Sequence, residues 1–173
     1  MDSPPYTWRI SKYDPALRDS QGHYLAEDWT FFAQIGQFFN GRQLTYEDYV
    51  SVENAYVHSV LRFLKDAGLS SLRISELPVP NSVFSSDSEL QDIRLQPELL
   101  ENENLVGLDQ LEDVIRINLR ELTWCKLQEA GRFYLHFGWD YYIYIGSTSP
   151  SSRAISDTTQ DGLYVEVKPS PYL

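Results

Sequence analysis

The stretch between Thr45 and Gly68 constrains the fold more than any other part of the sequence. Its large apolar side chains recur at spacings of three and four residues, as they do on the buried face of a helix. The residues of this stripe are Tyr49, Val52, Tyr56, Val60, Phe63 and Ala67. Thr45 suits a helix N-cap, and the acidic Glu47 and Asp48 suit the positive end of the helix dipole. Because Gly68 suits the left-handed position that ends a helix, the spacing predicts one long helix between these two residues.

Alternating apolar and polar residues predict strands in several parts of the chain. The stretches "YTWRISKY", "LSSLRISELPVP" and "GLYVEVK" each have this period of two. The segment "WCKLQEAGRFYLHFGWDYYIYIGS" predicts a hairpin that turns at Ala130 and Gly131. Its return strand is aromatic and spans 133–145, with Gly138 expected as a bulge or bend within it.

Two other segments predict helices. "EDWTFFAQIGQFFNGRQ" fits a short helix that packs Trp29, Phe32 and Ile35. "GLDQLEDVIRINLREL" predicts a helix with one apolar face, although the alternation in "VIRINL" leaves a strand open. The residues of that face are Leu108, Leu111, Ile115, Leu119 and Leu122. The chain between 81 and 104 is polar and irregular. Strands at both ends with helices between them predict a single α+β domain over 1–173, a mainly antiparallel sheet with two principal helices packed on it.

The composition excludes several classes of partner. With 14 Lys and Arg against 25 Asp and Glu, the net charge is −11. Such a field repels nucleic acid and anionic membranes and attracts basic partners. No stretch approaches the roughly 18 apolar residues of a membrane helix, and the first residues lack the apolar core of a secretory signal. Since Cys125 is the single cysteine, no internal disulfide can form, and a cytoplasmic location is expected.

One motif indicates an enzymatic alternative. Asp140, followed by Glu166 and Lys168, satisfies the D…E-x-K pattern of metal-dependent nucleases, in which two carboxylates hold Mg²⁺. Pro169 ends the strand at once, and the net charge opposes a polyanion, so a solvated strand face is the preferred interpretation. The histidines are scattered, and neither a nucleophile elbow nor a glycine-rich phosphate loop is present. We therefore expect no catalytic residue, metal or cofactor, and keep the nuclease as an alternative.

The negative charge is concentrated in the middle of the chain. Between Glu76 and Glu121, eleven acidic residues stand against three arginines, so this region supplies eight of the eleven net negative charges. A charged face is often only solvated. Acids interspersed with Leu and Phe are also what a docking surface for a basic protein needs, because charge steers the partner and apolar anchors hold it. The predicted contact residues are Glu89, Asp92, Glu98, Glu101, Glu103, Asp109 and Asp113.

Two blocks at the ends of the chain resemble a group of small bacterial proteins. "YDPALRDSQGHYLAEDWTFFAQIG" is similar to their opening, and "GWDYYIYIGS" followed by "GLYVEVKPSPYL" is similar to their close. The group is the immunity proteins of bacterial polymorphic toxin systems. The resemblance implies a non-catalytic inhibitor that binds one cognate toxin domain, with the uncovered middle region giving specificity. A third interpretation is a small structural or regulatory protein that associates with itself through its aromatic strand.

Overall fold

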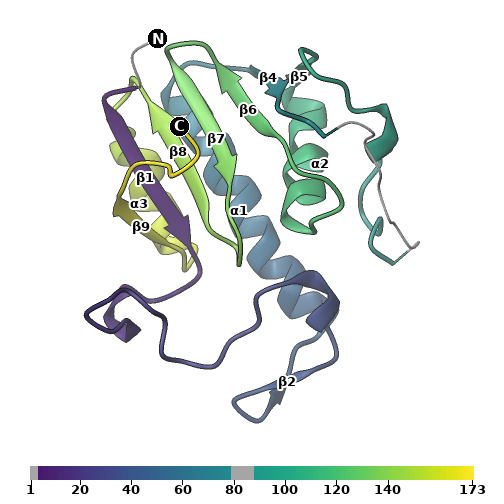
Figure 1. Cartoon of the computed structure of the whole chain (residues 1–173), viewed down its shortest axis with the longest axis vertical. Coiled ribbons are helices and arrows are strands. Elements are labelled where there is room, and N and C mark those ends of the chain that lie inside the picture. The colour runs from purple at the N-terminus through teal and green to yellow at the C-terminus, as the bar shows by residue number, and fades with distance from the viewer. Residues whose placement is uncertain (1–3, 79–87) are drawn as a thin grey trace.

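The computed structural model describes residues 4–78 and 88–173 (Figure 1). Within these residues, seven strands form one sheet in which every neighbouring pair is antiparallel. In spatial order they are β5 (Leu105–Gly107), β4 (Ser71–Ser75), β6 (Lys126–Glu129), β7 (Phe133–Phe137), β8 (Ile143–Ser147), β1 (Tyr6–Ser11) and β9 (Tyr164–Val167). The first and last parts of the chain therefore meet at one edge of the sheet.

Helices α1 (Tyr46–Asp66), α2 (Leu108–Leu119) and α3 (Ser152–Gln160) lie on one side of this sheet, and α1 contacts both of the others (Figure 1). The predicted long helix is confirmed as α1. Thr45 Oγ1 accepts a hydrogen bond from the Asp48 N–H (3.1 Å), and the Asp48 carboxylate accepts one from the Thr45 N–H (3.4 Å). This reciprocal cap satisfies two backbone donors that a helix start leaves unpaired. Gly68 follows the helix with a φ of +65°, as predicted.

The stripe of α1 faces the core. Tyr49, Tyr56, Val60 and Phe63 are fully buried, whereas Val52 and Ala67 at the margin of the stripe are half-buried. The second principal helix is also confirmed, since 108–119 is helical, and the strand alternative for "VIRINL" is wrong. The buried residues of α2 recur with the period of a helix, which explains why this segment is a helix and not a strand. They are Leu111, Val114, Ile115, Ile117, Asn118 and Leu119.

The two faces of the sheet are covered differently. Successive side chains of a strand point to opposite faces, so Leu135 and its register partner Ile145 pack beneath the helices. His136 points to the other face, which the last residues of the chain cross (Figure 1). There, Ser170 Oγ lies 2.8 Å from His136 Nδ1, and the Tyr172 ring packs against the sheet. Every residue of β7 and β8 is therefore buried.

The predicted strand 133–145 is wrong as a single strand. It is two strands, β7 and β8, joined by a tight turn in which the Gly138 N–H donates to the Tyr142 carbonyl (2.7 Å). Asp140 and Tyr141 at the centre of this turn have φ values of 56° and 63°. Two successive left-handed residues define the hairpin turn whose twist matches that of its strands. Gly138 thus starts a turn and is not a bulge within a strand.

The segment around Trp29 is also less helical than predicted. A single 3-10 turn, η2 (Phe32–Gln34), is followed by a small hairpin of β2 (Phe38–Phe39) and β3 (Arg42–Gln43). Trp29 and Phe32 are nevertheless buried, as the sequence predicts. Helix α3 and strand β5 were not predicted. The fold class is confirmed as α+β, with three helices on a seven-stranded antiparallel sheet in the described residues. Among the same residues, no helix is long and apolar enough to cross a membrane.

Candidate partner-binding surface

The predicted contact residues lie along the acidic segment, which we define as 88–104, and the first half of α2. Five of the seven are exposed, namely Asp92, Glu98, Glu101, Glu103 and Asp109. Glu89 and Asp113 are half-buried. The segment contains only one 3-10 turn, η3 (Pro97–Leu99), and leads through β5 directly into α2. The predicted residues therefore belong to one continuous part of the surface, beside the β5 edge of the sheet (Figure 1).

Two of these carboxylates hold the acidic segment in place. Asp113 on α2 accepts hydrogen bonds from the backbone N–H groups of Arg94 (3.1 Å) and Leu95 (2.9 Å). Asp92, whose φ is 64°, accepts one from the Tyr46 hydroxyl at the start of α1 (2.8 Å). A carboxylate already engaged in this way has fewer lone pairs for a partner. Asp113 in particular fixes the backbone of the acidic segment and contributes less to the charge that a partner would contact.

A buried charge network lies beneath the acidic segment. The side chain of Glu53 on α1 has no exposed surface, and Arg120 donates to both of its oxygens at 2.7 Å. Arg116 adds a third charged hydrogen bond at 2.7 Å, and the Tyr49 hydroxyl donates a fourth at 2.9 Å. Although burial lowers the pKa of Arg120, its hydrogen bonds and charge interaction with Glu53 outweigh burial and raise that pKa. Arg120 therefore stays charged inside the protein, with the Glu53 carboxylate as its hydrogen-bond acceptor.

Arg120 also fastens the acidic segment to this network. Its Nη1 donates to the carbonyl of Glu89 (2.9 Å) and to the carbonyl of Gln91 (2.6 Å). One guanidinium thus joins α1, α2 and the segment, using the several donors that its planar group presents in fixed directions. Because Arg116 and Arg120 both face Glu53, two of the three arginines in the acidic region do not offset its outward charge. The exposed face is more negative than the composition alone indicates.

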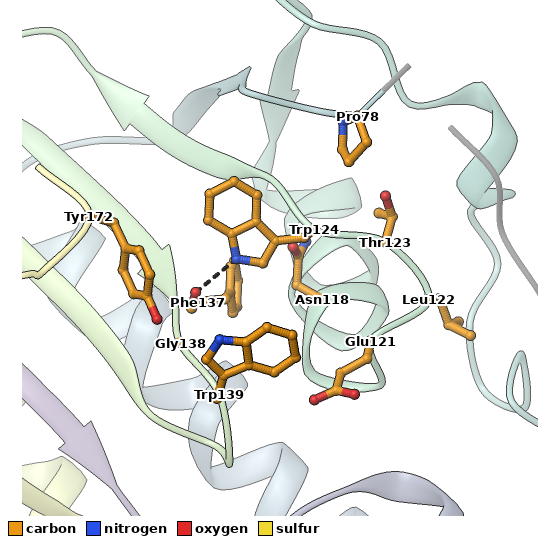
Figure 2. A pocket seen from close by; sticks show the side chains of 10 residues that line it. All are labelled: Pro78, Asn118, Glu121, Leu122, Thr123, Trp124, Phe137, Gly138, Trp139 and Tyr172. Atoms are coloured by element: carbon orange, nitrogen blue, oxygen red, sulfur yellow. Dashed lines mark hydrogen bonds between the residues drawn. The ribbon is translucent and has the colours of Figure 1, made fainter. Parts of the chain in front are cut away.

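A pocket of about 530 Å³, here called the tryptophan pocket, lies where α2 ends (Figure 2). It is formed by the end of α2, the loop before β6, the end of β7 and the last residues of the chain. Its lining residues are Pro78, Asn118, Glu121, Leu122, Thr123, Trp124, Phe137, Gly138, Trp139 and Tyr172. Figure 2 shows the indole rings of Trp124 and Trp139 on the same pocket, with the Glu121 carboxylate beside Trp139 and the Tyr172 ring across from it. The site is therefore aromatic, with one acidic group.

The two indoles are held in different ways. Trp124 is half-buried, and its Nε1–H donates to the Phe137 carbonyl (2.8 Å). Trp139 is 75% exposed, which is unusual for so large an apolar side chain, and it stands at the start of the β7–β8 turn. Tyr141 anchors that turn: its hydroxyl lies 2.6 Å from that of Tyr49, and its carbonyl accepts from the Tyr56 hydroxyl at 2.6 Å. Trp139 is thus displayed on a turn that is fixed to α1.

Glu121 has no cationic partner among the described residues. It follows Arg120 directly, with a φ of 57° that turns the chain away from α2. Burial against the pocket walls, and secondarily the charge of Asp140, raise the pKa of Glu121. Glu121 is therefore a negative group, with a raised pKa, on the lining of a mostly aromatic pocket.

The residues of the nuclease alternative lie in different surroundings. Glu166 on β9 stands opposite Arg9 on β1, which donates from Nε and Nη2 at 3.1 and 2.9 Å, and Arg18 Nη2 lies 3.7 Å away. Its carboxylate is thus held by two guanidinium groups. Asp140 is in the β7–β8 turn, and Lys168 is exposed. In the described part of the chain, no group of three or more His, Cys, Asp or Glu side chains could hold a metal ion.

Sequence reasoning missed the Glu53 network and the tryptophan pocket. A signal for the first was present, since Glu53 interrupts the apolar stripe between Tyr49 and Tyr56, while Arg116 and Arg120 lie four residues apart on the second helix. The pocket had no such signal, because its walls come from four separate segments. Comparison of the chain with models of known families, with curated proteins and with solved structures gave no match. The resemblance at the two chain ends stays a prediction.

Proposed function

We propose that this protein is a cytoplasmic, non-catalytic binding protein of the immunity type, which neutralises a basic toxin domain by covering it with the acidic segment. One observation carries the proposal: the exposed carboxylates of the segment lie beside arginines that are turned inward to Glu53. Of these exposed acids, Glu103 lies 4.0 Å from Arg73, while Glu98, Glu101 and Asp109 form no ion pair with a described residue, so most of the outward negative charge is not cancelled locally. A surface of this kind steers a cationic protein toward it, and repels nucleic acid and anionic membranes.

The rigid attachment of the acidic segment supports the same proposal. A segment rich in exposed charge and poor in regular structure would ordinarily be a flexible loop. Here, Asp113 fixes its backbone at 94–95, and Arg120 fixes it at 89 and 91. Fixed carboxylates can match a fixed pattern of basic groups, which gives specificity for one partner as well as attraction.

The test is the kinetics of binding to a toxin-like domain encoded beside this protein, measured at low and high salt. We expect tight one-to-one binding whose association rate falls as salt rises. A variant with Glu98→Lys and Glu101→Lys should associate about tenfold more slowly at low salt, with a shallower salt dependence. The matched control carries Glu27→Lys and Asp157→Lys, which make the same change in net charge away from the acidic segment.

Each outcome has a clear meaning. Slower association in the first variant alone supports binding through the acidic segment. Equal rates in both variants and the parent would remove the acidic segment from the interface. Absence of binding by well-folded protein would contradict the proposed function itself. Concentration-dependent mass in solution would instead favour the self-associating alternative.

A further inference from the structure

The tryptophan pocket combines aromatic walls with uncompensated negative charge. Trp124, Phe137, Trp139 and Tyr172 line it with rings from three segments of the chain (Figure 2). Of the lining residues that the structure describes, none is Lys or Arg, so Glu121 meets no positive charge among them. The faces of aromatic rings attract cations, and indole attracts them most strongly. A positively charged group is therefore the ligand that both features favour.

Another part of the same protein places a cation among groups of the same kinds. The ammonium of Lys12 lies 4.1 Å from the ring centre of Trp29 and 4.4 Å from that of Tyr13, and it forms an ion pair with Asp28. Two aromatic faces and one carboxylate thus hold a cation that is almost fully buried. The tryptophan pocket offers the same kinds of group, with Trp124, Trp139 and Glu121 in place of Trp29, Tyr13 and Asp28.

We propose that the tryptophan pocket binds the guanidinium of an arginine side chain supplied by a protein partner. A guanidinium is planar, so it can stack on an indole while it donates paired hydrogen bonds to a carboxylate such as Glu121. Its weak hydration lowers the cost of entering an apolar pocket compared with an ammonium. The partner is identified by the proposed function, on which this inference rests, because Glu121 of the pocket directly follows Arg120, which is hydrogen-bonded to the acidic segment.

The pocket can be tested without any toxin. The probes are three capped tripeptides, acetyl-Gly-X-Gly-amide, in which X is arginine, lysine or the neutral arginine analogue citrulline. We expect the arginine peptide to shift the NMR signals of the Trp124 and Trp139 indole N–H groups, with a dissociation constant on the order of millimolar. Lysine should bind roughly threefold or more weakly, and citrulline should bind at least about tenfold more weakly, because it stacks but carries no charge.

Variants distinguish a cation site from a merely apolar one. Glu121→Gln should weaken the arginine peptide about tenfold and leave citrulline unchanged, since only the charged interaction is lost. Trp139→Ala should weaken all the peptides, whereas Trp139→Phe keeps a ring and should retain part of the binding. Glu27→Gln, far from the pocket in sequence and not among its lining residues, is the matched control and should bind as the parent does. Circular dichroism confirms that each variant is folded.

Two results would overturn the inference. Equal binding of citrulline and arginine would show an apolar site without charge recognition. No shift of the two indole signals at high peptide concentration would show that the pocket does not bind this group. Either result leaves the salt-dependent kinetics with the toxin-like domain unaffected, and failure of that domain to bind leaves the peptide result standing. The two proposals can therefore fail separately.

Discussion

The carboxylate of Glu53 and the carboxylates of the acidic segment differ in their burial and in the groups that contact them. Glu53 is fully buried and receives two arginines and a tyrosine hydroxyl. Glu98 and Glu101, by contrast, are exposed and have solvent around them. A buried charge must be paired, because losing water costs several kcal/mol per ion, whereas an exposed one need not be. The comparison shows that Arg116 and Arg120 form ion pairs with the buried carboxylate of Glu53 and not with the exposed carboxylates of Glu98 and Glu101.

The strongest test of the comparison removes the buried carboxylate. Glu53→Ala leaves Arg120, whose side chain is also fully buried, without its counter-charge, and we expect a loss of about 4 kcal/mol in the free energy of unfolding. Urea denaturation followed by circular dichroism measures this. The matched variant Glu98→Ala should change it by less than about 0.5 kcal/mol. Similar losses in both variants would contradict the contrast between the two regions.

His136 shows what happens when a buried ionisable group has no opposite charge in contact. Burial, reinforced by the positive charge of Lys126, lowers the pKa of His136 from 6.5 to about 4. The unfolded chain then binds a proton that the folded protein does not, so stability contributed by neutral His136 is complete above pH 6.5 and is lost as the pH falls toward 4. We expect a decrease of about 3 kcal/mol across that range.

Denaturation of the parent and of His136→Gln at a series of pH values checks this expectation. The parent should lose stability between pH 6.5 and 4, and the difference between the two proteins should narrow as the pH falls. The substitution by glutamine lowers the free energy of unfolding at every pH, so the comparison uses only how that free energy changes with pH in each protein. Parallel pH profiles for the two proteins would assign the acid sensitivity to other groups.

Arg120 joins the two regions, so its removal should affect both. In Arg120→Met, Glu53 keeps Arg116 and the Tyr49 hydroxyl, and we expect a smaller loss than in Glu53→Ala, about 2 kcal/mol. The carbonyls of Glu89 and Gln91 also lose their donor. Hydrogen exchange should therefore become faster in the acidic segment. Faster exchange throughout the protein without a local excess would argue against the role of Arg120 in fixing the segment.

The smallest effect is expected from the exposed carboxylates themselves. Glu98→Gln with Glu101→Gln should change the free energy of unfolding by less than about 0.5 kcal/mol, because neither side chain is buried. A slight gain in stability at low salt is the expected direction, since repulsion within the acidic surface decreases. Thermal denaturation at two salt concentrations measures it. A loss above about 1 kcal/mol would show that these acids are structural.

Prediction from sequence succeeded where the information is local. The cap at Thr45, the apolar stripe and Gly68 all lie within α1 or next to it, so the helix could be located from its own residues. Helix α3 offered no comparable stripe: it is short and polar, and only Ala154 and Thr158 of it are buried. Its start is fixed from outside, as Asp66 at the end of α1 accepts a hydrogen bond from the Ala154 N–H (2.9 Å).

Prediction failed where distant residues decide the conformation. Tyr141, which follows Asp140 in the turn, adopts a left-handed angle that a sequence pattern would reserve for glycine, asparagine or aspartate. Hydroxyl groups of Tyr49 and Tyr56, 92 and 85 residues away along the chain, hold Tyr141 in that conformation. Asp113 illustrates the same limit at the candidate site, because its part in fixing the acidic segment depends on where the backbone at 94–95 runs.

The anchoring of the β7–β8 turn also bears on the entropy of recognition. A loop that carries an exposed tryptophan usually loses conformational freedom when a partner binds, and this loss subtracts from the affinity. Here the turn backbone is already ordered by the hydroxyls of Tyr49 and Tyr56, so only the torsions of the Trp139 side chain remain to be fixed. Two left-handed residues store roughly 1 kcal/mol or more each during folding, before any partner arrives. Trp139 is thereby preorganised, and contact with it can proceed without reshaping the protein.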